Sequence, residues 1–288
     1  MSQLKLFIEL TRLRKPIGYM LLFWPCTWGL TLAYDFTSEV NNYFFYLILF
    51  FLGAVLMRSA GCIVNDILDR NFDTKVTRTK DRPIASGKVS VRLGIIYSAI
   101  LCFSAFLVLI NFNLFTIILA LGSMPLAFTY PLMKRYTYWP QLFLGITFNY
   151  GLILGWTAVK GELNIVPVLF YIGAIFWTLG YDTIYGFQDI KDDEIIGLKS
   201  TAIKFKTNAN KFLFICYSLL LILFTLGGYY MNFHFSYYLL SIVPLMHLFL
   251  YQMKIFNFRD PMSCLKAFKS NNLFGFIILI NILIAKII

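Results

Sequence analysis

The chain has 288 residues, of which 59% are hydrophobic, 18% aromatic and only 14% charged. Soluble globular proteins carry about 25% charged residues, so this composition excludes an ordinary soluble protein and indicates an integral membrane protein. The formal net charge of +11 is compatible with nucleic acid as a partner, but the basic residues lie beside apolar segments, where they act as topology signals. We therefore expect the partner of this charge to be a lipid bilayer and not nucleic acid.

Nine apolar segments approach the length of about 20 helical residues that a bilayer requires. In chain order they are residues 17–34, 43–62, 92–110, 112–131, 140–159, 164–181, 211–230, 236–252 and 272–288. The third and fourth segments are separated only by Asn111, Phe112 and Asn113, which predicts a tight hairpin. No Ser/Gly-rich linker divides the chain. The sequence thus predicts an all-α integral membrane protein of about nine spans, with a single domain over residues 1–288.

The distribution of basic residues predicts the orientation, because Lys and Arg gather on the cytoplasmic side of membrane proteins. With the N-terminus in the cytoplasm, all of the 25 Lys and Arg residues lie inside except Lys160 and Lys286. The segment before the first span contains Pro16 and lacks the pattern of a cleavable signal peptide. We therefore expect a retained first span, a cytoplasmic N-terminus and an external C-terminus.

Two acidic clusters interrupt the apolar sequence. One extends from Asn65 to Asp73 and the other from Asp182 to Glu194, and together they hold eight of the fourteen acidic residues. The first follows the second span and the other follows the sixth span. Two four-helix halves and one extra terminal helix would place both clusters beside one central cavity. Carboxylate and amide oxygens are suited to Mg²⁺, so the pair predicts a divalent metal that holds a polyphosphate.

Helical phase at 100° per residue distinguishes the members of the first cluster. Asn65, Asp69 and Asp73 recur every four residues and form one stripe. Arg58 lies on the same stripe, about 10 Å deeper in the membrane.

In the second cluster the same 100° count places Asp182, Asp189 and Asp193 on one face. Asp192 and Glu194 point elsewhere, as solvated residues would. Each cluster thus contributes one stripe of carboxylates.

Basic side chains lie among these acids and are suited to phosphate oxygens, Arg in bidentate fashion. They include Arg70, Lys75, Arg78, Lys80, Arg82 and Lys199. The alternative is that the acids are solvated loop residues that balance a basic cytoplasmic surface. Arg58 and Asp182 favour a functional site, because they lie nearest the apolar interior and ionisable residues within membranes are usually functional.

Several motifs resemble those of the UbiA family of membrane prenyltransferases. The longest runs from Arg58 to Asp73 with the pattern N-D-x-x-D-x-x-x-D, and is followed by Arg78 to Gly87. Further matches are Arg14-Lys15-Pro16-Ile17-Gly18 with Trp24-Pro25, Tyr130 to Arg135, Gly180 to Asp193, and Lys199 to Ala202. The resemblance covers about residues 10–205, and beyond it only the hydrophobic pattern agrees. One departure is Phe205-Lys206, where relatives often carry Phe-Gly.

The resemblance implies an all-helical fold of eight or nine spans around a lipid-open cavity, a Mg²⁺ requirement and a place in the bacterial cell inner membrane or its mitochondrial counterpart. Within the family, the motifs are most similar to those of the enzymes that prenylate 4-hydroxybenzoate in ubiquinone biosynthesis. The implied substrates are a long-chain polyprenyl diphosphate and 4-hydroxybenzoate. The implied reaction is electrophilic aromatic substitution ortho to the hydroxyl, which gives 3-polyprenyl-4-hydroxybenzoate and diphosphate.

Resemblance and helical phase together assign the metal ligands and the basic substrate-binding residues. Asn65, Asp69 and Asp73 are expected to bind one Mg²⁺, Asp189 and Asp193 a second, and Asp66 is a candidate additional ligand. The basic residues expected to bind substrate are Arg70, Lys134, Arg135 and Arg14.

Three residues are candidates for the chemistry at the acceptor ring. Asp182 is expected to orient the acceptor hydroxyl or to accept its proton. Arg58 is expected to bind the acceptor carboxylate, a role for which Arg14 competes, and its alternative role is a structural ion pair with Asp182. Tyr130 is expected to stabilise the allylic cation through its π face, or else to anchor the chain at the membrane interface.

Two other functions remain open from the sequence. One is prenyl transfer to another aromatic or tetrapyrrole acceptor, since the preference for 4-hydroxybenzoate rests on resemblance alone. The other is an ion-coupled transporter with acidic ion sites at broken helices. A transporter favours charges near the middle of the membrane, whereas these acids cluster toward one surface.

Overall fold

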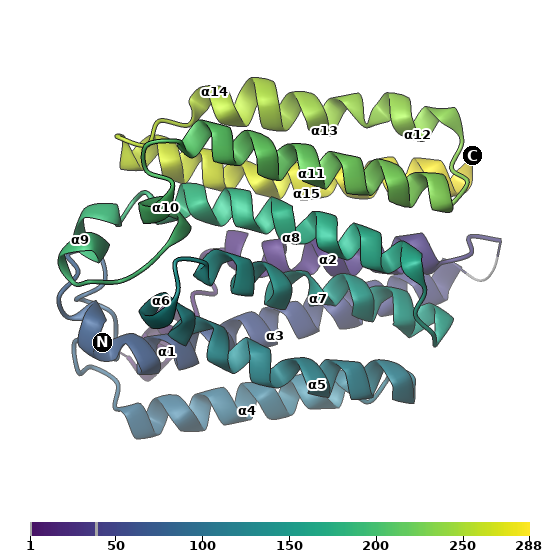
Figure 1. The fold of residues 1–288 in the computed structure, drawn as a ribbon. Helices are drawn as coiled ribbons and strands as arrows, with labels where there is room; N and C mark the ends of the chain where they lie inside the picture. Colours follow the sequence, from purple (N-terminus) through teal and green to yellow (C-terminus); the bar gives the residue numbers. More distant parts are fainter. Residues whose placement is uncertain (1, 38–39) are drawn as a thin grey trace.

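The computed structural model describes residues 2–37 and 40–288, and within them the chain is all-helical (Figure 1). Eight helices are long and apolar enough to cross a membrane, and the shorter apolar helix α2 adds a ninth candidate. The prediction of a membrane protein with about nine spans is confirmed. Its spanning elements are α2 (Ile17–Ala33), α3 (Val40–Asp73), α4 (Val91–Leu109), α5 (Leu114–Thr129), α7 (Pro140–Lys160), α8 (Ile165–Gly186), α11 (Ala209–Tyr230), the run α12 to α14 (Phe235–Ile255) and α15 (Pro261–Ile287).

The short helices lie mostly at one end of the bundle, at the left of Figure 1. They are α1 (Gln3–Leu10), α6 (Met133–Tyr136), α9 (Ile190–Ile195) and α10 (Thr201–Lys204), with the 3₁₀ turn Tyr130–Leu132 leading into α6. We call this end, together with the loop 74–90, the charged end. The chain begins there and ends at the opposite side, as an odd number of spans requires.

The predicted hairpin between the third and fourth spans is confirmed. Helix α4 ends at Leu109 and α5 begins at Leu114. Asn113 caps α5, because its Oδ1 accepts the backbone N–H of Thr116 at 3.0 Å, which satisfies one donor at the helix start. Its Nδ2 also donates to the carbonyl of Thr157 at 2.8 Å, so the turn is fastened to α7.

Helix α3 continues well beyond the membrane. Its 34 residues extend over about 51 Å at 1.5 Å per residue, whereas the hydrocarbon core of a bilayer is about 30 Å thick. The extra turns carry Asn65, Asp69 and Asp73 into the charged end on an unbroken helix. The stripe predicted from helical phase in the first cluster is therefore present.

The second cluster departs from the predicted phase. Helix α8 ends at Gly186, and α9 begins at Ile190 after a turn in which Asp189 occupies the N-cap position. Phe187 is 2% exposed and packs on Phe256 with ring centroids 5.5 Å apart, so burial of its ring accompanies the turn. The prediction that Asp182, Asp189 and Asp193 share one face of a continuous helix was wrong, because the helix is interrupted between Gly186 and Ile190.

Helices α2 and α7 touch closely at the level of two glycines. A Cβ on Gly29 would lie 1.9 Å from the carbonyl oxygen of Leu152, and one on Gly155 would lie 2.3 Å from that of Cys26. Neither position can hold a larger residue unless the helices move apart. Both helices start at the charged end, so this contact lies toward their far ends.

Candidate active site

A cavity of about 1190 Å³ occupies the charged end. Its lining comes from α1, α2, α3, the loop 74–90, the turn Tyr130–Leu132, α6, α7, α8, α9 and α15. The predicted site residues that line it are Arg14, Arg58, Asn65, Asp66, Asp69, Asp73, Tyr130, Lys134, Asp182, Asp189 and Asp193. The two acidic clusters, more than a hundred residues apart in sequence, thus face a single space.

Asp69 and Asp73 of the first cluster each have a basic partner. Lys134 Nζ donates to Asp69 Oδ2 at 2.5 Å, and Arg82 Nη1 donates to Asp73 Oδ2 at 2.9 Å. Asp69 is 1% exposed and Asp73 is 6% exposed. Buried carboxylates need such partners, since an isolated buried charge is costly.

Asp66 lies between two arginines. Arg12 Nη2 donates to its Oδ1 at 2.6 Å, and Arg82 Nη1 approaches the same oxygen at 3.2 Å. This geometry favours a role for Asp66 in positioning the two arginines. It favours less the role of additional metal ligand for which the sequence made Asp66 a candidate. Arg12 has a φ of 56°, a conformation that is uncommon for residues other than glycine.

The second cluster is held by the loop 74–90. Arg78 Nε donates to Asp189 Oδ1 at 2.8 Å, and its Nη1 donates to the hydroxyl of Tyr185 at 2.8 Å. The backbone N–H of Thr77 donates to Asp192 Oδ2 at 3.3 Å. Asp192 is therefore bonded to the loop and not merely solvated as the sequence predicted.

Asp193 lacks a basic partner. It forms no ion pair within the described part of the chain, and its backbone N–H donates to Asp189 O at 2.9 Å. Burial, followed by the charge of Asp189, raises the pKa of Asp193 to about 6. A carboxylate destabilised by burial and by a like charge is suited to gain a cation. Glu194 differs, because it is paired with Lys206 at 2.8 Å.

Arg58 and Asp182 lie deeper in the cavity. The Arg58 guanidinium lies over the ring of Phe148 at 5.3 Å and against Gly18, where a Cβ would be 2.8 Å from Arg58 Nε. Across residues 2–37 and 40–288, Arg58 forms no ion pair, so the alternative of a structural pair with Asp182 is not observed. A cation without a carboxylate partner thus faces the cavity.

Tyr130 and Lys134 enter from the turn between α5 and α7. The Tyr130 ring meets Phe148 edge-on at 6.5 Å. The backbone N–H of Lys199 donates to the Lys134 carbonyl at 2.8 Å, and that of Thr201 donates to Gln141 Oε1 at 3.0 Å. The segment after α9 therefore fixes the element that carries Lys134.

Two predicted diphosphate-binding residues do not line the cavity. Arg70 is exposed at the end of α3. Arg135 donates to the carbonyl of Leu68 at 2.6 Å and lies over the ring of Phe72 at 5.0 Å. The cavity instead contains Arg12, Arg78 and Arg82. The sequence named Arg78 and Arg82 among six basic residues suited to phosphate, but it did not name Arg12 for the site. Arg12 and Arg78 contact acids that lie 54 and 111 residues away, which no local pattern indicates.

The donor set is compatible with Mg²⁺, although the described residues do not form a complete metal site. No group of three or more His, Cys, Asp or Glu residues is gathered closely enough among them to hold an ion. However, Asp69 Oδ1 is buried without a hydrogen-bond partner, and Arg135 Nη2 lies 3.8 Å from it, beyond hydrogen-bond distance, so this oxygen can accept a metal ion. Mg²⁺ is usually bound by one or two carboxylates plus substrate phosphates, and such a site does not require three acids in place beforehand.

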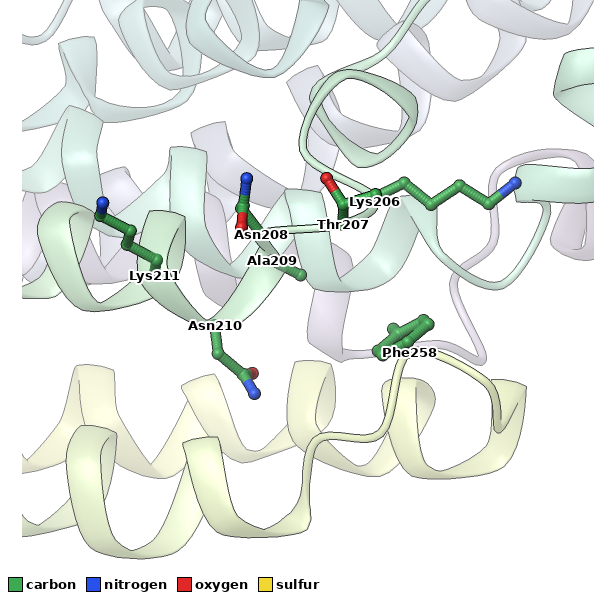
Figure 2. Close-up of a pocket in the computed structure, with 7 residues that line it drawn as sticks. All are labelled: Lys206, Thr207, Asn208, Ala209, Asn210, Lys211 and Phe258. Carbon is green, nitrogen blue, oxygen red and sulfur yellow. The ribbon is translucent and has the colours of Figure 1, made fainter.

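A second, smaller pocket lies on the surface at the start of α11. Its volume is about 190 Å³, and it is lined by residues 206–211 and Phe258 (Figure 2). Figure 2 shows the ammonium groups of Lys206 and Lys211 pointing in opposite directions. Lys206 is already paired with Glu194, so the charged groups of this pocket do not point toward one common ligand position.

The chain is similar to known proteins over most of its length. The model of the UbiA prenyltransferase family matches residues 22–278. The mitochondrial 4-hydroxybenzoate polyprenyltransferase of Bos taurus is 43% identical to the chain, over 98% of the chain and 75% of that protein. The 4-hydroxybenzoate octaprenyltransferase of Vibrio campbellii is 42% identical, over 98% of the chain and 97% of that protein.

A similar fold is found in a solved structure, that of a UbiA homolog from Archaeoglobus fulgidus bound to GPP and Mg²⁺. It superposes with a TM-score of 0.71 at 16% sequence identity, over 95% of this chain and 99% of that one. Family model, relatives and fold lead to one classification. The chain is a multi-pass membrane protein that belongs to the UbiA prenyltransferase family.

Proposed function

We infer that this chain transfers a polyprenyl group from polyprenyl diphosphate to the ring of 4-hydroxybenzoate, in the pathway of ubiquinone biosynthesis. Relatives with this activity in their names share about 40% identity with it over nearly its full length. The observation that carries the proposal is the single cavity in which both acidic clusters meet arginines, a lysine and the deep pair Arg58 and Asp182. The chain acts as a single domain over residues 1–288.

The products follow from the bonds that change. The allylic C–O bond of the donor breaks, a C–C bond forms at the ring carbon ortho to the hydroxyl, and that carbon loses its proton. The electron pair of the C–O bond leaves with the diphosphate. The products are 3-polyprenyl-4-hydroxybenzoate, diphosphate and one proton.

Mg²⁺ is the proposed cofactor, and when bound it neutralises the diphosphate and favours its departure. Asn65, Asp69 and Asp73 would hold one ion, and Asp189 and Asp193 the other. Two observations support this assignment: Asp69 Oδ1 has no hydrogen-bond partner, and Asp193 forms no ion pair among the described residues. The structure of the Archaeoglobus fulgidus homolog contains GPP and Mg²⁺, which supports Mg²⁺ as the cofactor.

The basic residues of the cavity would bind the diphosphate oxygens. Lys134, Arg12, Arg78 and Arg82 are paired with the carboxylates of the two clusters. If Mg²⁺ occupied Asp69, Asp73 and Asp189, Lys134, Arg82 and Arg78 would be free to turn toward phosphate oxygens, while Asp66 would keep Arg12 in position. Donors placed in advance around a developing negative charge stabilise it most where water is excluded. Arg14 also lines the cavity and remains a candidate for the same role.

The acceptor would bind deeper than the diphosphate. The unpaired guanidinium of Arg58 is suited to the carboxylate of 4-hydroxybenzoate. Asp182, on a different wall of the cavity, is placed to orient the hydroxyl or to take its proton. Tyr130 lies beside Lys134 in sequence, where its ring is suited to the allylic cation.

The proposed location is the cell inner membrane, with the active site on the cytoplasmic side. The charged end gathers the basic loops, which the positive-inside rule assigns to the cytoplasm. The polyprenyl chain of the donor would then remain in the lipid while its diphosphate enters the cavity.

Prenyl transfer in membranes that contain the chain tests this function. Radiolabelled 4-hydroxybenzoate and a long-chain polyprenyl diphosphate should give a lipid-soluble labelled product with Mg²⁺, and none after chelation with EDTA. Membranes without the chain serve as the blank. Absence of labelled product from membranes that contain the folded chain and both substrates would refute the assignment.

A further inference from the structure

A buried chain of hydrogen bonds runs from α7 to the deep wall of the cavity through Asn149, Thr178 and Tyr181. Asn149 Nδ2 donates to Thr178 Oγ1 at 2.7 Å, and Thr178 Oγ1 donates to the hydroxyl of Tyr181 at 3.2 Å. Asn149 and Thr178 are fully buried, and Tyr181 is 1% exposed. Tyr181 nevertheless belongs to the cavity lining.

The direction of this chain is fixed at its inner end. Asn149 Nδ2 also donates to the carbonyl of Gly145 at 2.8 Å. A carbonyl can only accept, so the amide nitrogen must face it, and the amide cannot be reversed. The same nitrogen faces Thr178, whose hydroxyl proton must therefore point away from it, toward Tyr181.

The consequence is a free proton on Tyr181. Its oxygen accepts the bond from Thr178, and among residues 2–37 and 40–288 no acceptor for its own hydroxyl proton is present. The ring is held by Trp177, with centroids 4.9 Å apart, and by Phe268 at 5.8 Å. A tyrosine of the cavity lining thus carries a hydroxyl donor that is fixed in orientation and lacks an acceptor among the described residues.

The arrangement is costly if it is only structural. Asn149 Oδ1 is buried with no hydrogen-bond partner, and an unsatisfied buried polar atom destabilises a fold by about 1–3 kcal/mol. Apolar side chains would join α7 and α8 without that cost. Polar residues retained within a membrane span are usually functional.

The position of the hydroxyl indicates what it binds. Side chains on a helix lean toward its N-terminus, and for α8 this is the end away from the charged end. The Tyr181 hydroxyl therefore lies one turn deeper than its own Cα, beside Thr178. Arg58 is also deep, and its guanidinium faces the same cavity without a carboxylate partner.

We propose that Tyr181 donates its hydroxyl proton to the carboxylate of the aromatic acceptor, alongside Arg58, and that Thr178 and Asn149 orient it. The proposal rests on the proposed function, because it needs an acceptor with a carboxylate. Tyr181 contacts substrate, whereas Thr178 and Asn149 are positioning residues. Asp182, the next residue, remains free for the hydroxyl at the other end of the ring.

The test is a steady-state comparison in membranes, with 4-hydroxybenzoate varied at saturating donor and the donor varied at saturating acceptor. Tyr181→Phe should raise the KM for 4-hydroxybenzoate by about 10-fold or more, as expected for a lost hydrogen bond to a charged group. The KM for the donor should not change. Thr178→Val should shift the acceptor KM in the same direction by a smaller factor, and Thr178→Ser should restore it.

Two arms exclude a merely structural explanation. Methyl 4-hydroxybenzoate has no charged carboxylate, and its ester carbonyl accepts only a weaker, neutral hydrogen bond, so Tyr181→Phe should raise the KM for the ester by a clearly smaller factor than the KM for 4-hydroxybenzoate. Tyr217→Phe is the matched control, because the Tyr217 hydroxyl is buried and bonded to Gln252 but does not line the cavity. It should leave the acceptor KM unchanged.

The outcomes separate the two proposals. A wild-type chain that gives no prenylated 4-hydroxybenzoate would refute the proposed function. An active wild type with an unchanged acceptor KM in Tyr181→Phe would overturn the inference alone. An equal shift in Tyr217→Phe, or an equal shift with the methyl ester, would likewise overturn it, because either result assigns the effect to general packing.

Discussion

The two acidic clusters carry similar residues but are built differently. In the first, Asp66, Asp69 and Asp73 lie on one unbroken helix and are 1%, 1% and 6% exposed. In the second, the helix stops at Gly186, Asp189 caps a separate short helix and Asp193 lies on it, and the loop 74–90 holds this segment in place. Carboxylates on a continuous buried helix are positioned by the fold itself, whereas those on a short helix depend on contacts made by other segments.

Among the substitutions that test this difference between the clusters, Asp69→Asn is expected to lower activity most. It removes the charge of a carboxylate whose buried Oδ1 has no hydrogen-bond partner, and it leaves Lys134 without its counter-charge. Prenyl transfer should fall by about 10³-fold, the upper range for losing one preorganised electrostatic group. Activity assayed over a range of Mg²⁺ concentrations, beside thermal unfolding in detergent, checks it. Activity within tenfold of wild type would contradict the metal assignment.

Asp193→Asn should weaken activity less and in a different manner. The fall should be about 10²-fold at limiting Mg²⁺ and should be partly restored by excess Mg²⁺, since Asp189 remains and metal affinity changes by factors of about 10 to 100 for such losses. Titration of activity with Mg²⁺ measures the half-saturating concentration. An unchanged half-saturating concentration would show that Asp193 is not a ligand.

Asp66→Asn tests whether Asp66 positions arginines or binds metal, as Asp69 and Asp73 of the same helix are proposed to do. Because Asp66 holds Arg12 and Arg82, its loss should raise the KM for the prenyl diphosphate and lower the rate by about 10-fold. The half-saturating Mg²⁺ concentration should stay at the wild-type value. A large increase in that concentration would place Asp66 among the ligands, as the sequence first suggested.

Glu194→Gln is the smallest change and the internal control. Glu194 pairs with Lys206 at the surface, with side chains 38% and 46% exposed, and exposed pairs contribute little. Activity should remain within about twofold of wild type by that reasoning. A loss as large as that of Asp193→Asn would mean that α9 as a whole, and not its two cavity-facing acids, determines activity.

Local patterns in the sequence predicted much of the fold. Apolar length located the nine spans, and Asn111 to Asn113 located the hairpin between α4 and α5. Helical phase succeeded for Asn65, Asp69 and Asp73, because α3 stays helical through all of them. It failed after Asp182, because the chain leaves the helix at Gly186 where tertiary packing buries Phe187.

The partners of the acids could not be predicted in the same way. Arg12 reaches Asp66 across 54 residues, and Arg78 reaches Asp189 across 111. Such pairings depend on how α1 and the loop 74–90 fold over the cavity. Arg70 illustrates the difficulty, since it stands among the acids in sequence but is exposed on the helix that carries them.

The close contact of α2 and α7 affects the width of the cavity. Gly29 and Gly155 bring these helices to backbone contact at one level. At the other level the same helices border the cavity, with Ile17 and Leu21 of α2 and Pro140 and Phe148 of α7 in its lining. The distance between α2 and α7 at the cavity therefore depends on the angle between the two helices at this contact. An added methyl group at Gly155 would change that angle, and with it the width available to the acceptor ring, without touching any residue that binds substrate.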